Sequence, residues 1–142
     1  MREPLAQLYV HIIWSTWDRL PLIAPELEQA IYACIQSECK ALNTEPIAIG
    51  GTCDHVHLLA RIPASLSVSA LVKQVKGSSS HLVTHVLSPR AAFKWQGGYG
   101  AFSVSPDRVP VVRSYVVDQK MHHGDGTTDV RWEADFAPED AE

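Results

Sequence analysis

The chain has 142 residues, of which 46% are hydrophobic and 20% are charged. This length predicts one globular domain with a hydrophobic core and is too short for two ordinary domains. The formal net charge of −4 at pH 7, taken as an average, argues against a protein whose whole surface binds nucleic acid, because such surfaces usually carry a basic excess.

The charge is unevenly distributed along the chain. Residues 1–123 contain 11 Lys and Arg against 9 Asp and Glu, whereas residues 124–142 contain only Arg131 against seven acidic residues. The balance is therefore +2 for the first part and −6 for the second. We expect a domain over 1–123 and an acidic C-terminal tail over 124–142. The large apolar residues that can anchor this tail on the domain are Val130, Trp132 and Phe136.

The cysteine content and the absence of long apolar runs bear on the location of the protein. The three cysteines are odd in number, lack C-x-x-C spacing and occur without an apolar leader at the N-terminus. These features predict a reducing, cytoplasmic location. No run of about 18 apolar residues occurs, so we expect no membrane-spanning segment.

The first half of the sequence predicts a strand, a helix and two further strands. Residues 8–17 are rich in β-branched and aromatic types that alternate with a period of two. Over 25–42, apolar residues recur at helical spacing, and acidic residues lie in the first turn, where the helix dipole favours them. Two more strands are expected at about 46–53 and 55–62.

The second half predicts two helices separated by extended chain. A helix is expected from about 67 to 87, followed by two short extended pieces around a glycine turn within 93–105. A last helix is expected from about 109 to 122. The resulting order βαββαβα predicts an α+β sandwich of the ferredoxin-like or RRM-like kind, with helices on one face of an antiparallel sheet.

Two histidines in the third predicted strand form the sharpest local motif. His55 and His57 are two residues apart, so in a strand both imidazoles point to the same face. Imidazole nitrogens are common metal ligands, but two strand histidines that form only local hydrogen bonds are the more frequent case. His11, which alternates into the first predicted strand, is expected to be a structural histidine.

The last predicted helix carries a tyrosine and an amide on one face. Tyr115 and Gln119 are four residues apart, and His122 and His123 follow one turn later. A tyrosine in this position is usually a core-edge residue with its ring inward and its hydroxyl outward. The amide oxygen of Gln119 is nevertheless a suitable ligand for a hard cation.

Taken in chain order, these motifs resemble those of the small single-tyrosine transposases of bacterial insertion sequences. Those transposases are members of the HUH nuclease superfamily, and the REP-associated tyrosine transposases are their relatives. The resemblance covers most of residues 8–123. The motifs that carry it are Tyr9-Val10-His11, Trp14-Ser15-Thr16 with Arg19, Asp54-His55-Val56-His57-Leu58-Leu59, Val75-Lys76-Gly77-Ser78-Ser79, Trp95, Gly98-Tyr99-Gly100-Ala101-Phe102-Ser103-Val104-Ser105, Tyr115-Val116-Val117-Asp118-Gln119 and His122-His123.

The resemblance implies a catalytic role for Tyr115 and a metal site. His55, His57 and Gln119 would bind a divalent cation, Mg²⁺ or Mn²⁺, and Tyr115 would attack a phosphodiester of single-stranded DNA. The product would be a 5′-phosphotyrosine link and a free 3′-OH. Because the link retains the energy of the phosphodiester, another 3′-OH can reverse the step and join new strands.

The resemblance also implies partners. Members of the family bind DNA hairpins at element ends and work as homodimers, in which two sheets merge and the tyrosine helix of one chain completes the histidine site of the other. Basic residues are the natural candidates for phosphate contacts, although each one taken singly is as often an ordinary surface residue. The candidates are Arg19, Lys73, Lys76 and Lys94.

Two alternatives remain open at this point. A host-retained relative would bind or nick hairpins without mobilising itself. A non-catalytic, RRM-like module would bind nucleic acid by stacking bases on its strands, although the RNP-type signature of such modules is missing from the sequence.

Overall fold

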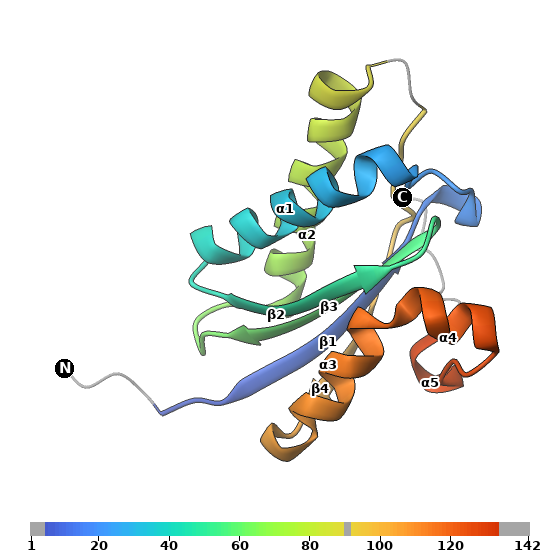
Figure 1. The fold of residues 1–142 in the computed structure, drawn as a ribbon. Coiled ribbons are helices and arrows are strands. Elements are labelled where there is room, and N and C mark those ends of the chain that lie inside the picture. Colours follow the sequence, from blue (N-terminus) through green and yellow to red (C-terminus); the bar gives the residue numbers. More distant parts are fainter. Residues whose placement is uncertain (1–4, 90–91, 134–142) are drawn as a thin grey trace.

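Four antiparallel strands form an open sheet in the spatial order β2-β3-β1-β4 (Figure 1). The computed structural model describes residues 5–89 and 92–133 of the chain. The sheet confirms the predicted α+β class, with the first and third strands at its centre. The strands are β1 (Leu8–Ser15), β2 (Glu45–Gly51), β3 (His55–Ile62) and β4 (Gly100–Val104).

The central strand β3 is buried on both faces. Every residue of it except Arg61 is buried. Because successive side chains of a strand point to opposite faces, Val56 and Leu58 lie on one side, and His55 and His57 lie on the other. A strand of this kind requires a covering layer on each side of the sheet.

Two helices cover the first face. Helix α1 (Pro25–Ala41) begins with a proline and has Glu26 and Glu28 in its first turn, which suit a helix start. Helix α2 (Val68–Leu82) begins after Ser67, whose side chain accepts a hydrogen bond from the amide of Ala70. Together with the sheet, these helices enclose the larger apolar core, which includes Ile12, Trp14, Ile31, Ile35, Val56, Leu58, Leu71 and Val75.

The third helix does not join the first two, which differs from the prediction that the helices share one face. Helix α3 (Val109–Val117) lies across the opposite face of the sheet, together with α4 (Gln119–Asp125) and α5 (Val130–Glu133) (Figure 1). A second, smaller apolar cluster lies beneath α3 and includes Ala48, Leu59, Val104, Val112 and Val116. Helix α3 covers these apolar residues. One of them, Leu59, lies between the two histidines and the end of β3.

The predicted helix 109–122 is divided into two. Asp118 has φ −96° and ψ 27° and separates α3 from α4, so the chain changes direction between Tyr115 and the two histidines that follow. A glycine allows α3 to lie close to the sheet here. A Cβ at Gly50 would be 1.9 Å from the carbonyl oxygen of Val116, which no side chain permits.

The remaining predicted elements are confirmed with small changes in their ends. The helix expected over 67–87 ends as α2 at Leu82 and continues as a π-helical segment, Val83–Leu87. The extended chain within 93–105 contains β4 and a single bridge between Trp95 and Thr16. Among the described residues, no helix is long and apolar enough to cross a membrane.

Candidate active site

The two histidines of β3 lie next to each other on the face covered by α3 to α5. His55 and His57 are 1% and 0% exposed, and their ring centroids are 5.1 Å apart. They are opposite Ser15 and Ile13 of β1 in the sheet register. Because β3 pairs with β1 on one side and β2 on the other, it presents both imidazoles from within the sheet.

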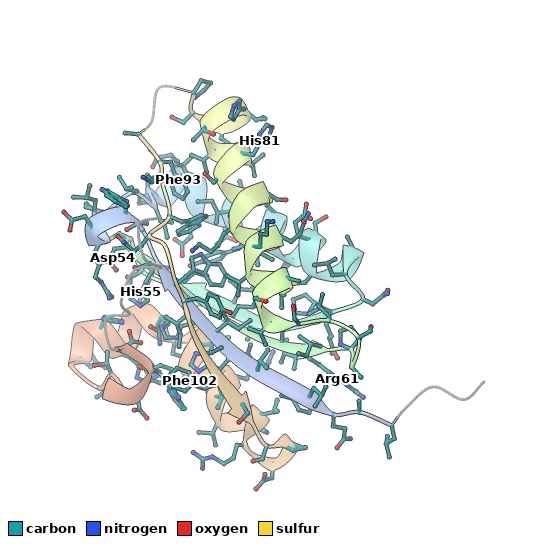
Figure 2. The ribbon with its side chains drawn as sticks, turned by 180° about the vertical axis from the view of Figure 1, so that it is seen from behind. Asp54, His55, Arg61, His81, Phe93 and Phe102 are labelled. Atoms are coloured by element: carbon teal, nitrogen blue, oxygen red, sulfur yellow. The ribbon has the colours of Figure 1, made fainter. Side chains whose placement is uncertain are left out.

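Polar neighbours orient His55 from behind. Asp54, next to it at the start of β3 (Figure 2), accepts a hydrogen bond from Nδ1 of His55 at 2.7 Å. This bond holds the pKa of Asp54 below its usual value. Thr52 Oγ1 lies 2.9 Å from the same nitrogen. Because the proton of a neutral imidazole is then on Nδ1, Nε2 presents a lone pair to the site.

His57 is held by a third histidine. Nε2 of His11, in β1, lies 2.8 Å from Nδ1 of His57, and His11 is fully buried. Burial lowers the pKa of His11 to about 3 and that of His57 to about 4, so both rings are neutral at pH 7. Nε2 of His57 is buried and points into the same cluster, toward Oε1 of Glu133. An imidazole nitrogen in this position is a suitable cation ligand.

Gln119, the first residue of α4, points its amide oxygen at the same place. Its Nε2 donates to the carbonyl oxygen of Tyr115 at 3.1 Å, and this leaves Oε1 at 3.2 Å from Nε2 of His55. The side chain is completely buried. The structure therefore brings together the three residues expected from the sequence to bind a metal.

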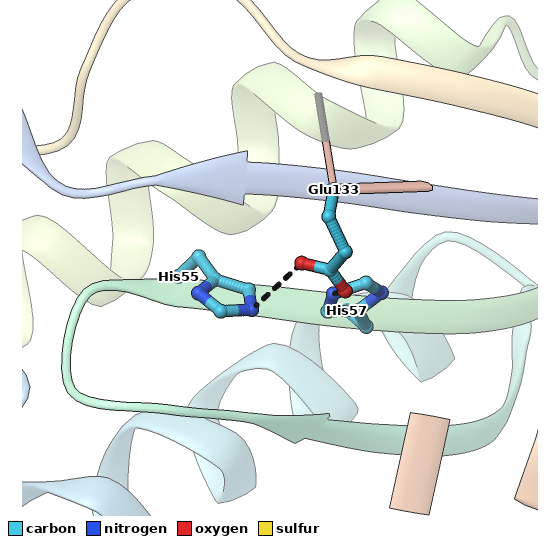
Figure 3. A group of neighbouring side chains, drawn as sticks. All are labelled: His55, His57 and Glu133. Atoms are coloured by element: carbon cyan, nitrogen blue, oxygen red, sulfur yellow. Dashed lines mark ion pairs between the residues drawn. The ribbon is translucent and has the colours of Figure 1, made fainter. Parts of the chain in front are cut away.

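Glu133 of α5 completes the cluster (Figure 3). Its Oε1 lies 2.9 Å from Nε2 of His57, and its Oε2 lies 3.4 Å from Nε2 of His55. One ligand atom from each of these three residues lies within 4.8 Å of the others. Burial raises the pKa of Glu133, but its contacts with His57, His55 and Tyr115 more than offset this and hold the pKa at about 2. Two imidazole nitrogens and several oxygens with inward lone pairs form a donor set that fits a divalent cation.

The hydroxyl of Tyr115 lies at the edge of this cluster. It donates to Oε1 of Glu133 at 2.9 Å and accepts from the amide of Asp129 at 2.8 Å. The ring of His122 stacks on the tyrosine ring at 4.6 Å, and the ring of His57 lies 5.8 Å away. Tyr115 is only 7% exposed, and its burial raises the pKa of the phenol to about 12.

Comparison with known proteins identifies the family. The family model described as "Transposase IS200 like" matches residues 5–119, which is most of the chain. The chain belongs to the IS200-like transposases. No curated protein matches it significantly.

Two solved structures resemble this IS200-like transposase. A candidate transposase from Deinococcus radiodurans is 22% identical, with a TM-score of 0.65, and the match covers 82% of this chain and 93% of that one. A REP-associated tyrosine transposase bound to a REP hairpin is 14% identical, also with a TM-score of 0.65, and the match covers 99% of this chain and 94% of that one. Both likenesses establish the shared fold.

Sequence reasoning missed Glu133, which it placed only in an acidic tail. The residues after α4 turn back at Gly126, which has a positive φ of 69°, and return to the site. We call residues 127–133 the closing segment. Trp132 anchors it on the domain, as the sequence allowed, whereas Phe136 lies outside the described residues. The family match ends at residue 119, before this segment begins.

Two of the basic residues proposed as phosphate contacts lie at the loop that follows β1. Nε of Arg19 is 3.9 Å from Oδ2 of Asp54, which itself holds His55. Nζ of Lys94 lies 4.0 Å from the centre of the Trp17 ring, and the Trp17 amide donates to the Lys94 carbonyl oxygen. Both cations therefore flank the loop that follows β1.

The other two basic residues lie on α2, on the far face of the sheet. Lys76 donates to the carbonyl oxygens of Gln96 and Gly98 at 2.7 and 3.1 Å, so its ammonium holds the segment that leads into β4. Lys73 is exposed on the same helix. The four residues thus form no single basic cluster.

Proposed function

We propose that the protein is a metal-dependent, single-stranded DNA transposase that cleaves and rejoins strands through a phosphotyrosine intermediate on Tyr115. The observation that carries this proposal is the convergence of the Tyr115 hydroxyl with the side chains of His55, His57 and Gln119 in one buried site. A tyrosine beside a set of cation ligands is what an in-line attack on a phosphodiester requires.

The roles of the residues follow from their positions. His55, His57 and Gln119 would hold Mg²⁺ or Mn²⁺, with Asp54 and His11 orienting the two imidazoles from behind. The bound cation supplies Lewis-acid polarisation of a non-bridging phosphate oxygen. The oxygen of Tyr115 forms a bond to phosphorus, and the bond from phosphorus to the 3′ oxygen breaks. The phenolic proton of Tyr115 passes to solvent, and a proton from solvent completes the free 3′-OH.

The partners in this proposal are hairpin-bearing DNA and a second copy of the chain. Strands β2 and β4 are the outer strands of the sheet, so an edge is available to pair with another copy. Within one chain, Tyr115 lies beside its own histidine pair rather than being extended away from it. A homodimer that shares its sites would therefore require α3 and α4 to exchange between subunits.

A second candidate function keeps the same site but without self-mobilisation. The likeness to a REP-associated tyrosine transposase bound to a REP hairpin favours hairpin recognition, and a host-retained protein would bind or nick such hairpins. Imperfect palindromes flanking the gene would support mobility, whereas solitary repeats scattered through the genome would support the retained function.

The test of the proposed chemistry is the formation of a covalent adduct. We expect wild-type protein with Mn²⁺ and hairpin-bearing single-stranded DNA to give a protein–DNA species on a denaturing gel. Tyr115→Phe should give none while still binding the hairpin. If the wild type forms no adduct, or if Tyr115→Phe still forms one, the proposal is wrong, and a non-catalytic binding module becomes the better explanation.

A further inference from the structure

The closing segment places two consecutive side chains in two different parts of the site. Trp132 packs edge-to-face against His11 and Tyr115, with ring centroids 5.0 and 4.9 Å apart. Glu133 places its carboxylate between His57 and the Tyr115 hydroxyl. One aromatic ring and one anion, adjacent in the chain, thus pack against two aromatic rings and against the cation-ligand cluster.

This pair has the chemistry of a nucleotide. An indole is flat and similar in size to a nucleobase, and a carboxylate shares with a phosphodiester a negative charge and two exposed acceptor oxygens. Base and phosphate are also adjacent in a DNA strand. From this correspondence, and resting on the proposed function, we infer that the place Trp132 occupies, against His11 and Tyr115, is a subsite for the nucleobase next to the scissile phosphate. Trp132 and Glu133 occupy the places of base and phosphate.

The aromatic neighbours of Trp132 suit a base. The rings of His11 and Tyr115, whose centroids are 6.5 Å apart, both contact the indole. Phe102 of β4 lies opposite His11 in the sheet register, with the ring centroids 6.3 Å apart. Aromatic side chains bind unpaired bases by stacking, largely without regard to sequence.

DNA and the closing segment cannot occupy the site together. His55, His57 and Gln119 are at most 1% exposed, and both hydrogen bonds of the Tyr115 hydroxyl go to the segment. Besides these contacts, the segment is held at its start by hydrogen bonds between His122 and Thr127. The closing segment is not part of the sheet, so it can be displaced without unfolding the sheet.

The experiment measures DNA binding by fluorescence anisotropy with the full chain in EDTA, so that no cleavage is needed. The probes are a labelled oligothymidylate and an abasic oligonucleotide of the same length. We expect Trp132→Ala to bind oligothymidylate roughly tenfold more tightly than wild type, because the base no longer competes with the indole. The gain should be much smaller for the abasic strand.

Glu133→Gln should bind both oligonucleotides more tightly than wild type, because it removes a negative charge from the place that the phosphate would occupy. Trp132→Phe, which retains a ring, and Glu26→Gln, which removes a charge on the far face, are the controls and should bind like wild type. Equal gains of Trp132→Ala for both strands, or no gain, would overturn the inference. Because the readout is binding without metal, failure of the subsite is distinguishable from failure of the proposed cleavage.

Discussion

Both faces of the sheet contain fully buried side chains, but the buried polar groups of the site lie on only one of them. On the face under α1 and α2, Ile12, Trp14 and Leu58 are fully buried, and on the face under α3 to α5 the same is true of His57 and Gln119. Burial of the first set stabilises the fold. Burial of polar groups costs free energy unless each finds a partner. The comparison teaches that the first face maintains the fold and that the second keeps polar groups in place for chemistry.

The substitutions with the largest expected effects distinguish the two faces of the sheet most clearly. Leu58→Ala should lower the free energy of unfolding by about 2–5 kcal/mol, because it leaves a cavity in the apolar core. His57→Ala, from the same strand, should abolish cation-dependent cleavage and keep hairpin binding. Urea unfolding and a cleavage assay on both variants check this contrast. Equal loss of stability in both would show that His57 has a folding role instead.

The polar face should also make the metal-free protein sensitive to acid. The pKa values of His11 and His57 fall from 6.5 to about 3 and about 4 on folding, chiefly through burial. At pH values between these pKa values and 6.5, the unfolded chain binds more protons than the folded one. The free energy of unfolding therefore decreases as the pH falls through this range.

Urea unfolding in EDTA at about pH 7 and about pH 5 measures this loss. His11→Phe should reduce the dependence on pH, whereas Leu58→Val, on the apolar face, should leave it unchanged. Identical pH dependence in wild type and His11→Phe would show that this histidine does not contribute to it.

A smaller effect tests how α3 is seated on the polar face. Gly50→Ala should destabilise the protein by about 1–3 kcal/mol and reduce cleavage, because the new methyl group would push the carbonyl of Val116 and shift Tyr115. Gly77→Ala is the matched control. It lies in α2 with open space around its Cβ and should stabilise the protein by about 0.5–1 kcal/mol. Unchanged cleavage by Gly50→Ala would contradict this account of the α3 position.

The smallest effect concerns phosphate contacts. Lys94→Ala should weaken DNA binding by a similar factor for all sequences and reduce the dependence of log Kd on log salt by about one. Lys76→Ala should instead lower stability, because its ammonium holds two carbonyl oxygens before β4. Salt titrations of both variants check this, and an unchanged slope for Lys94→Ala would exclude a phosphate contact there.

Local periodicity predicted how neighbouring residues of the site are arranged, whereas their common role was expected only from the resemblance to the family. Two residues of separation place His55 and His57 on one face of a strand, and four residues place Gln119 against the Tyr115 carbonyl on successive helices. The strand and helix order followed from the same periodicities.

The rest depends on contacts between residues far apart in the chain. His11 and His57 are 46 residues apart, and only the pairing of β1 with β3 reveals that His11 holds a site residue. Tertiary packing likewise determines on which face of the sheet α3 lies and where the helix is interrupted, at Asp118. It also determines that Glu133 returns to the site. A short segment such as 127–133 has no periodicity from which its position could be read.

The most direct test of the central claim is to locate the DNA on the protein. Wild-type protein incubated with Mn²⁺ and hairpin-bearing single-stranded DNA would be digested with nuclease and protease, and the modified peptide sequenced by mass spectrometry. The account predicts a nucleotide linked through its 5′ phosphate to Tyr115. A nucleotide on another residue, or none on any peptide, would contradict it.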